Sequence, residues 1–205
     1  MTITQYLTAV LCYSIFQANY KKHHGKKPIK ICIPVNLKKY FKSKTINNFF
    51  SYITLELGEK QIDSFDHLLR FVKEDFEKRL TEEEILKTMS ANVKLGNHPF
   101  IRMIPLALKK VFVKLSYIEI RKYTTTTFSN IGRVGIIAEY QKYIENFLFL
   151  IAPESVEKIK CSACSYENTI VFTITSILAD KKIEHYFCQF LKEQGIDVKI
   201  EDNGV

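Results

Sequence analysis

The order of strand-like and helix-like segments constrains the fold of this 205-residue chain more than any single motif. Thr2 and Gln5 have the spacing of a capping box, so the sequence predicts a helix that begins at once and a segment that ends at Gly25 and Pro28. The run IKICIPV, residues 29–35, alternates and is rich in β-branched residues, which is typical of a strand. NFFSYITLEL, residues 48–57, is expected to form a second strand.

Helix signals dominate the middle of the chain. Ser64 begins one predicted helix, and Thr81 with Glu84 has the spacing of a second capping box. A third helix is expected to start near Pro105, because proline fits the first turn of a helix.

Strand signals return after about residue 124. Two short extended runs are predicted in TTTTFSNIGRVGII, around Asn130 and Gly132. A buried strand is predicted for FLFLIAP, residues 147–153. Residues 158–177 are expected to form a hairpin that turns at Glu167-Asn168. A helix over 181–194 and a last strand at 196–200 complete the pattern. The prediction is an α/β fold, a two-layer sandwich of a mixed β-sheet with helices, in one domain over residues 1–205.

Composition narrows the function classes. The formal net charge of +8 fits nucleic acid, an anionic membrane or a phosphorylated ligand, but the lysines are dispersed, which favours a solvated basic surface. No apolar run approaches the roughly 18 residues of a membrane span, and the N-terminus lacks a basic region typical of a signal peptide. A cytoplasmic protein with reduced core cysteines is the expectation.

Two motifs could carry chemistry by themselves. The CSAC of Cys161 and Cys164 has no second metal-ligand pair at suitable spacing and lies in a predicted strand, so core packing or surface exposure is favoured over a metal or redox site. His98, in LGNHPF, is the only histidine that we expect could lie in a cleft, and no carboxylate partner is visible for it. We therefore predict no catalytic residue and no metal site.

Several segments in fixed order resemble one family. The chain resembles the carboxyl half of the chloramphenicol acetyltransferase superfamily in five segments. They are TITQYLTAVL, IPVNLKKYF, NFFSYITLEL, TFSNIGRVGI, and a hairpin ending TITS that is followed by a helix and GIDV. The texture is closest to that of alcohol acetyltransferases and of condensation domains of nonribosomal peptide synthesis. The resemblance covers about residues 2–200.

The resemblance implies a function. Long members of this family consist of two similar α/β halves around a tunnel, in which an acyl thioester on coenzyme A or a carrier meets an acceptor alcohol or amine. An HHxxxDG motif in the amino half supplies a histidine as general base, a role that suits the pKa of imidazole. The expected co-substrate is an acyl-CoA or acyl carrier thioester, with no cofactor held by this chain.

The double histidine of HHGKKPI does not fit that motif. His23 and His24 are followed by Pro28 and Ile29 where the family has aspartate and glycine, and they lie between a first helix and a strand of the carboxyl half. A solvated turn is favoured. The chain is thus expected to need an amino half carrying HHxxxDG, fused or separate, and to be inactive alone.

The resemblance also implies substrate-binding residues. The SNIG turn matches the family's segment near the acyl-transfer centre, where polar side chains can hydrogen-bond thioester or acceptor, and the threonines before it can do the same. IPVNLKK and the NF that follows match elements that support the interface facing the catalytic loop. The candidates are Ser129, Asn130, Gly132, Thr127, Asn36, Asn48 and Phe49.

Simple turn and cap roles explain these residues equally well. A second hypothesis for the whole chain is a non-catalytic module that keeps the fold and binds a partner or forms a homo-oligomer. A nucleic-acid binder, suggested by charge alone, ranks last, and neither a nucleic-acid partner nor a membrane span is predicted.

Overall fold

A mixed β-sheet forms one layer of the structure, a computed structural model that describes residues 1–20 and 28–203. Within these residues five strands are arranged in the order β2-β1-β3-β4-β5. β1, β3 and β4 run parallel, and the edge strands β2 and β5 run antiparallel to their neighbours. The strands are β1 (Ile29–Asn36), β2 (Phe50–Leu57), β3 (Thr126–Arg133), β4 (Ile159–Tyr166) and β5 (Thr169–Ser176).

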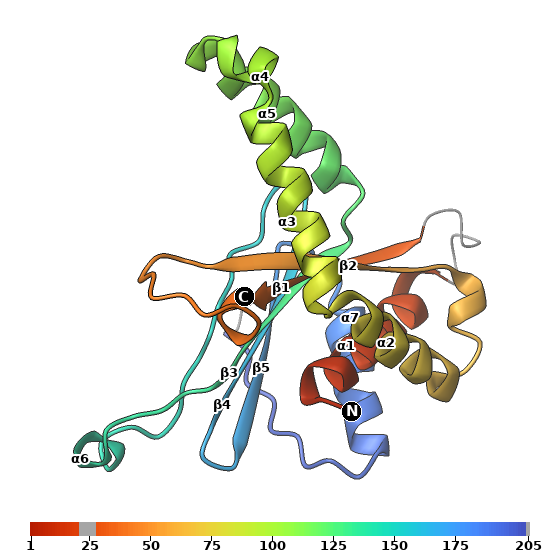
Figure 1. The fold of residues 1–205 in the computed structure, drawn as a ribbon. Helices are drawn as coiled ribbons and strands as arrows, with labels where there is room; N and C mark the ends of the chain where they lie inside the picture. Colours follow the sequence, from red (N-terminus) through yellow and green to blue (C-terminus); the bar gives the residue numbers. More distant parts are fainter. Residues whose placement is uncertain (21–27, 204–205) are drawn as a thin grey trace.

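Three helices form the second layer on one face of this sheet (Figure 1). The hydrophobic core lies between the two layers and contains side chains from every strand except β5, whose Phe172 and Ile174 pack against it partly buried. Leu11, Ile31, Leu55 and Phe128 at its centre are fully buried. The covering helices are α1 (Ile3–Ile15), α2 (Phe65–Arg79) and α7 (Lys182–Glu193).

Local signals explain where these elements begin and turn. The Thr2 hydroxyl accepts from the Gln5 amide at 3.2 Å, and the Gln5 side chain accepts from the Thr2 amide at 2.7 Å, which confirms the predicted capping box. Ser64 and Thr81 cap their helices as expected. The β4–β5 hairpin turns at Glu167, which adopts a positive φ of 50°.

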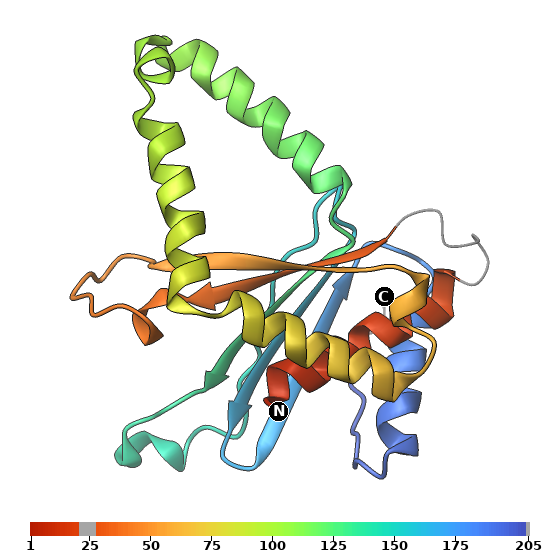
Figure 2. The same ribbon diagram turned by 45° about the vertical axis from the view of Figure 1, so that its right-hand side comes forward.

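Three further helices extend away from the sheet. Helices α3 (Glu82–Asn97), α4 (Pro99–Met103) and α5 (Leu106–Lys122) connect β2 and α2 to β3. Figure 2 shows α3 and α5 extending away from the body of the protein and approaching each other at the far end, where α4 joins them. A short helix α6 (Ala138–Gln141) lies in the long connection between β3 and β4.

Two predicted strands are wrong. Residues 147–153 and 196–200 are irregular in the structure. The segment 147–153 is apolar and lies against the sheet. Its carbonyl groups accept hydrogen bonds from side chains of β4 and β5 in place of the backbone hydrogen bonds of a neighbouring strand. The two short runs expected around Asn130 are a single strand, β3.

The predicted fold class, a mixed sheet layered with helices, is confirmed. The connection after β1 begins with a short 3-10 helix, Leu37–Lys39, which a loop follows. Within the described ranges no helix is long and apolar enough to cross a membrane. His23 and His24 lie outside the described residues.

Candidate functional site

The face of the sheet opposite α1, α2 and α7, called the far face below, carries the polar side chains of β3 and β4. Strand alternation sends Phe128 and Cys161 into the helix-covered core. The same alternation directs Thr127, Lys160 and Ser162 to the far face.

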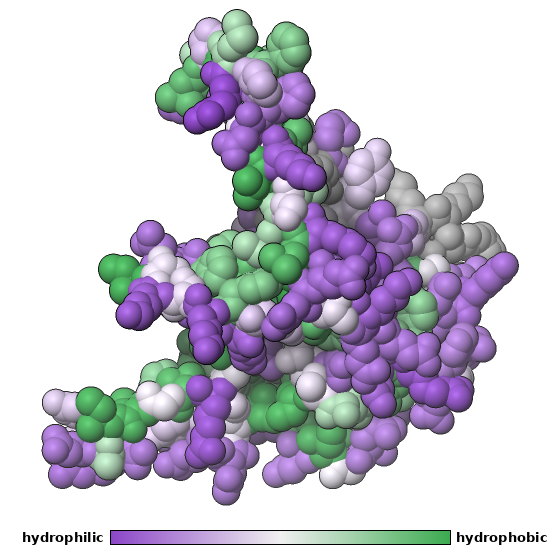
Figure 3. Space-filling model, viewed as in Figure 1, coloured by the Kyte–Doolittle hydropathy of each residue, from purple (hydrophilic) through white to green (hydrophobic). Residues whose placement is uncertain are grey.

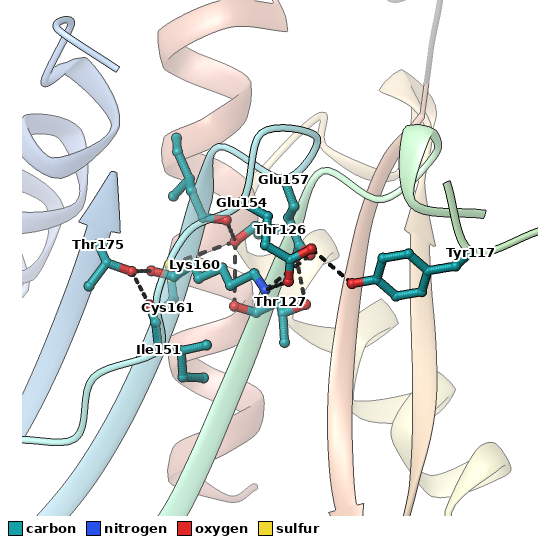
Figure 4. Close-up of polar contacts among 10 residues, drawn as sticks. Tyr117, Thr126, Thr127, Ile151, Glu154, Glu157, Lys160, Cys161 and Thr175 are labelled. Atoms are coloured by element: carbon teal, nitrogen blue, oxygen red, sulfur yellow. Dashed lines mark hydrogen bonds and ion pairs between the residues drawn. The ribbon is translucent and has the colours of Figure 1, made fainter. Parts of the chain in front are cut away.

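Five of these and neighbouring residues form a polar cluster that is buried at Thr127, Glu157 and Lys160 and exposed at Tyr117 (Figure 4). The Thr127 hydroxyl donates to Glu157 Oε1 at 2.5 Å. Lys160 Nζ forms an ion pair with Glu154 and lies 3.8 Å from Glu157 Oε2. The Tyr117 hydroxyl donates to Glu154 Oε2 at 2.8 Å. We call Tyr117, Thr127, Glu154, Glu157 and Lys160 the polar cluster.

Burial makes this cluster energetically sensitive. Glu157 is fully buried and Lys160 is 5% exposed, so each charge depends on the other residues of the cluster in place of water. A buried charge is tolerated when it is paired and hydrogen-bonded, and it is costly when a partner is lost. The cluster therefore fixes the positions of α5, β3, β4 and the 154–157 turn relative to one another.

The same contacts restrict what Thr127 can do. Because its hydroxyl proton is donated to Glu157, the Thr127 side chain cannot also donate a hydrogen bond to a ligand. Its side chain is thus held in one orientation on the far face. Ser129, two residues further along β3, is half-buried on the same face.

The segment 147–151 lies across β4 and β5 on the far face. Ser162 donates to the Phe149 carbonyl, and Thr175 donates to the Ile151 carbonyl at 2.5 Å. The thiol of Cys164 donates to the Phe147 carbonyl at 3.2 Å. The intervening Leu148 and Leu150 point outward and are 67% and 60% exposed.

The CSAC cysteines are both buried, on opposite faces of β4. Cys161 packs in the helix-covered core, where burial raises the pKa of its thiol to about 12. Cys164 contacts the far-face segment as described above. Core packing is therefore confirmed for Cys161, whereas Cys164 is buried beneath the 147–151 segment. In residues 1–20 and 28–203, no group of three or more His, Cys, Asp or Glu side chains is arranged to hold a metal ion.

The predicted SNIG residues make a bulge that is held by α1. Asn130 Oδ1 accepts from the Gly132 amide at 2.8 Å, and Asn130 Nδ2 donates to Thr4 Oγ1 at 3.1 Å. Gly132 has a φ of +77°, which only glycine adopts without strain, and the β3–β4 register shifts between Asn130 and Arg133. The Asn130 side chain is therefore directed to the helix side.

The other predicted group lies at the end of β1. Asn36 Oδ1 accepts from the Lys38 amide at 3.0 Å and caps the 3-10 helix. The Phe49 carbonyl accepts from the Leu37 amide at 3.0 Å, and Asn48 is exposed. These contacts hold the start of the β1–β2 connection.

The structure does not bring the two groups together along the sheet. β1 and β3 pair only at Ile31–Cys32 with Thr126–Thr127, and the two strands diverge toward their carboxyl ends (Figure 2). Asn36 lies at the carboxyl end of β1, and Asn48 and Phe49 precede its partner β2. Thr127 and Ser129 lie on β3.

The histidines in the described ranges lie elsewhere. His67 Nδ1 is 2.7 Å from Asp63 Oδ1, and this hydrogen bond lowers the pKa of the Asp63 carboxyl. His98 is exposed and stacks on Phe100 between α3 and α4, so it is not in a cleft. These contacts, with Asp63 and Phe100, do not join either histidine to the polar cluster. 

Sequence reasoning missed the ionic part of the cluster. Glu154, Glu157 and Lys160 occur in PESVEKIKC, where they resemble an ordinary solvated turn. The available signal was the position of Lys160, which alternates with apolar residues inside a strand that is otherwise buried. A lysine at such a position needs a carboxylate, and two lie within six residues of it.

Comparisons with known proteins find a likeness of fold. No protein-family model matches the sequence, and no curated protein matches it. The structure is similar to the epimerization domain from the third module of tyrocidine synthetase B, with a TM-score of 0.55 and 11% identity. It is also similar to a double mutant of the starter condensation domain of the rhizomide synthetase RzmA, with a TM-score of 0.53 and 10% identity.

The matches cover 94% and 98% of this chain but only 40% and 45% of those two chains. The chain has the fold of half a condensation domain. The predicted half-domain fold is therefore confirmed as a fold. At these identities the likeness concerns the fold alone, and the half-domain fold gives no activity by itself.

Proposed function

We propose that this half-domain is the carboxyl half of a CoA- or carrier-dependent acyltransferase of the alcohol O-acetyltransferase type. In this proposal the far face and the diverging ends of β1 and β3 form one wall of a substrate tunnel. An amino half, fused or separate, carries HHxxxDG and supplies the base that deprotonates the acceptor. The acyl thioester enters as a co-substrate, and this chain is inactive alone.

The main support for the proposal is that this chain matches only part of each condensation-type domain. Nearly all of this chain matches less than half of each condensation-type domain. An exposed apolar surface supports it, because Ile137, Tyr140, Tyr143, Leu148 and Leu150 of the β3–β4 connection are more than half exposed. Contiguous exposed apolar surface is typical of an interaction site.

The far face offers groups that suit a binding wall. Thr127 and the half-buried Ser129 present hydroxyl groups on the same face of β3, and in this proposal these two contact a thioester or an acceptor hydroxyl. The polar cluster holds Thr127 in place. No histidine belongs to the polar cluster as defined by its contacts, and the base is assigned to the amino half.

The test is reconstitution. The coding DNA upstream of Met1 is sequenced, the HHxxxDG-bearing segment found there or next to it is produced, and CoA release from acetyl-CoA with a panel of alcohols is measured. We expect no release by this chain alone and release by the two halves together. Release by this chain alone, or a lack of both association and release with the amino half, would contradict the proposal.

A variant then tests the wall. Ser129→Ala is expected to lower kcat/KM of the reconstituted pair about five- to tenfold, the value of one hydrogen bond. Ser90→Ala, on the exposed side of α3, is the matched control and should leave kcat/KM unchanged. An unchanged kcat/KM for Ser129→Ala would exclude Ser129 from the wall.

The second candidate is a non-catalytic binding or oligomerisation module with the same fold. The exposed apolar side chains of the β3–β4 connection also favour this reading. It predicts a defined homo-oligomer by light scattering and no upstream or adjacent HHxxxDG segment. The proposed acyltransferase half predicts instead that the amino half displaces any self-association.

A further inference from the structure

The projecting helices expose apolar side chains along their whole length. Residues 91–117, from the second half of α3 through α4 and most of α5, are called the arm below. Figure 3 shows hydrophobic residues at the end of the arm, interspersed with hydrophilic ones. Phe100 and Met103 at this end are 75% and 80% exposed. The other exposed large hydrophobic residues are Val93, Leu95, Leu106, Leu108, Val111, Phe112, Val113, Leu115 and Tyr117.

Part of this surface forms a helical stripe. Leu108, Val111, Phe112 and Leu115 on α5 have the spacing i, i+3, i+4 and i+7, which places them on one face of the helix. By the same spacing Lys109 and Lys114 flank this stripe on its two sides, and Lys110 lies opposite it. α5 therefore has an apolar face bordered by cations, with no protein packed on it among the described residues.

The charge of the arm has one sign. Residues 91–117 contain four lysines and one arginine and no aspartate or glutamate. The other exposed apolar surface, in residues 134–157, contains four glutamates and one lysine. The two surfaces thus differ in electrostatic potential, and they extend from opposite ends of the molecule (Figure 1).

We propose that the arm binds the surface of a lipid bilayer that contains anionic lipids. Apolar side chains of the arm enter the boundary between headgroups and acyl chains, and Lys94, Arg102, Lys109, Lys110 and Lys114 contact the anionic headgroups. The arm lies on the bilayer, in agreement with the finding that no described helix could cross one.

The composition of the arm selects lipid over other anionic partners. A nucleic acid would contact the five cations, but its phosphate backbone gives no favourable burial to leucine, valine and methionine side chains. A bilayer interface accepts apolar side chains and cations at once, without a partner whose acidic groups match the arm one by one. The proposal does not depend on the acyltransferase function, since it concerns a different surface.

Vesicle flotation tests it with the whole chain. We expect the protein to float with vesicles of phosphatidylcholine containing about one third phosphatidylglycerol, and much less with phosphatidylcholine alone. The triple variant Lys109→Gln, Lys110→Gln and Lys114→Gln should weaken the partition about a hundredfold, from a factor of roughly five for each basic residue. Phe100→Ser with Met103→Ser should also weaken it.

A control variant with the same loss of charge separates binding through the arm from the general electrostatic attraction of a basic protein to anionic vesicles. Lys38→Gln, Lys39→Gln and Lys42→Gln remove the same charge from the exposed β1–β2 connection and should leave most of the binding intact. Circular dichroism of each variant checks that the fold is kept. No binding to anionic vesicles, or equal loss in the control and the arm variants, would overturn the proposal. So would arm variants that keep vesicle binding but abolish association with the amino half, because the arm would then be a protein interface.

Discussion

Lys160 is a cation that the sheet holds away from water, with Glu154 and Glu157 as its partners. Replacing it by methionine keeps the stem of the side chain but leaves Glu157 buried without that cation. We expect Lys160→Met to lower the free energy of unfolding by about 3 kcal/mol. Urea denaturation measures it. Lys158→Met, an exposed neighbour, should change stability by less than about 0.5 kcal/mol, and equal effects of the two would contradict the account.

Burial of Cys161 links stability to alkaline pH. Its folded pKa is raised to about 12, above the ordinary value for a thiol, so the unfolded chain ionises first as pH rises. The stability that this thiol contributes is complete below pH 9 and is lost progressively toward pH 12. Cys161→Ala should reduce the fall in unfolding free energy between pH 8.5 and 10.5 by about 2 kcal/mol in total. An unchanged slope would contradict the burial of this thiol.

Strand β3 depends on one residue for its bulge. Gly132 has a positive φ, and no atom lies within 4 Å of the position that a Cβ would occupy, so Gly132→Ala introduces backbone strain without a clash. We expect a loss of about 1 kcal/mol in unfolding free energy. Gly135→Ala, also in open space and without a positive φ, is the control and should be neutral or slightly stabilising. Equal losses for both would show that the bulge needs no glycine.

The elements that the sequence predicted correctly have local signals. Thr2 with Gln5, Ser64 and Thr81 mark helix starts through hydrogen bonds made within one turn, and the β4–β5 hairpin has its turn in the chain itself. The strand predicted for residues 147–153 is wrong because an apolar run indicates burial only. Whether such a run forms a strand depends on a pairing partner elsewhere in the chain. Ser162 and Thr175 provide side-chain contacts there in place of a ladder.

The sequence predicts less of the candidate site than of the fold. The positions of Thr127 and Ser129 on the far face follow from strand alternation once Phe128 is assigned to the core. The direction of Asn130 does not, because the bulge after it and its contact with Thr4 break the alternation. The pairing of Lys160 with Glu154 and Glu157 depends on a turn whose geometry no local signal predicts.

At the scale of the molecule, two exposed apolar surfaces serve two separate purposes in our proposals. Leu148→Asp with Leu150→Asp should lower the affinity for the amino half at least about tenfold, because both side chains point outward from the far-face segment. Isothermal titration measures it. Ile200→Asp is the control, since the neighbouring Val198 packs on the helix-covered core and Ile200 is exposed near that side. A double variant with unchanged affinity would place the interface elsewhere.

The parallel pairing at the centre of the sheet has a kinetic consequence. The Lys30 amide donates to Thr125 Oγ1 across 95 residues, so β1 meets β3 only after a long loop has closed. The β4–β5 hairpin and the helices of the arm need no such closure and should form first. Domains dominated by distant contacts fold in milliseconds to seconds, slower than helical bundles. Through that interval the apolar side chains of the arm stay accessible to other unfinished chains, and the yield of refolding should fall as protein concentration rises.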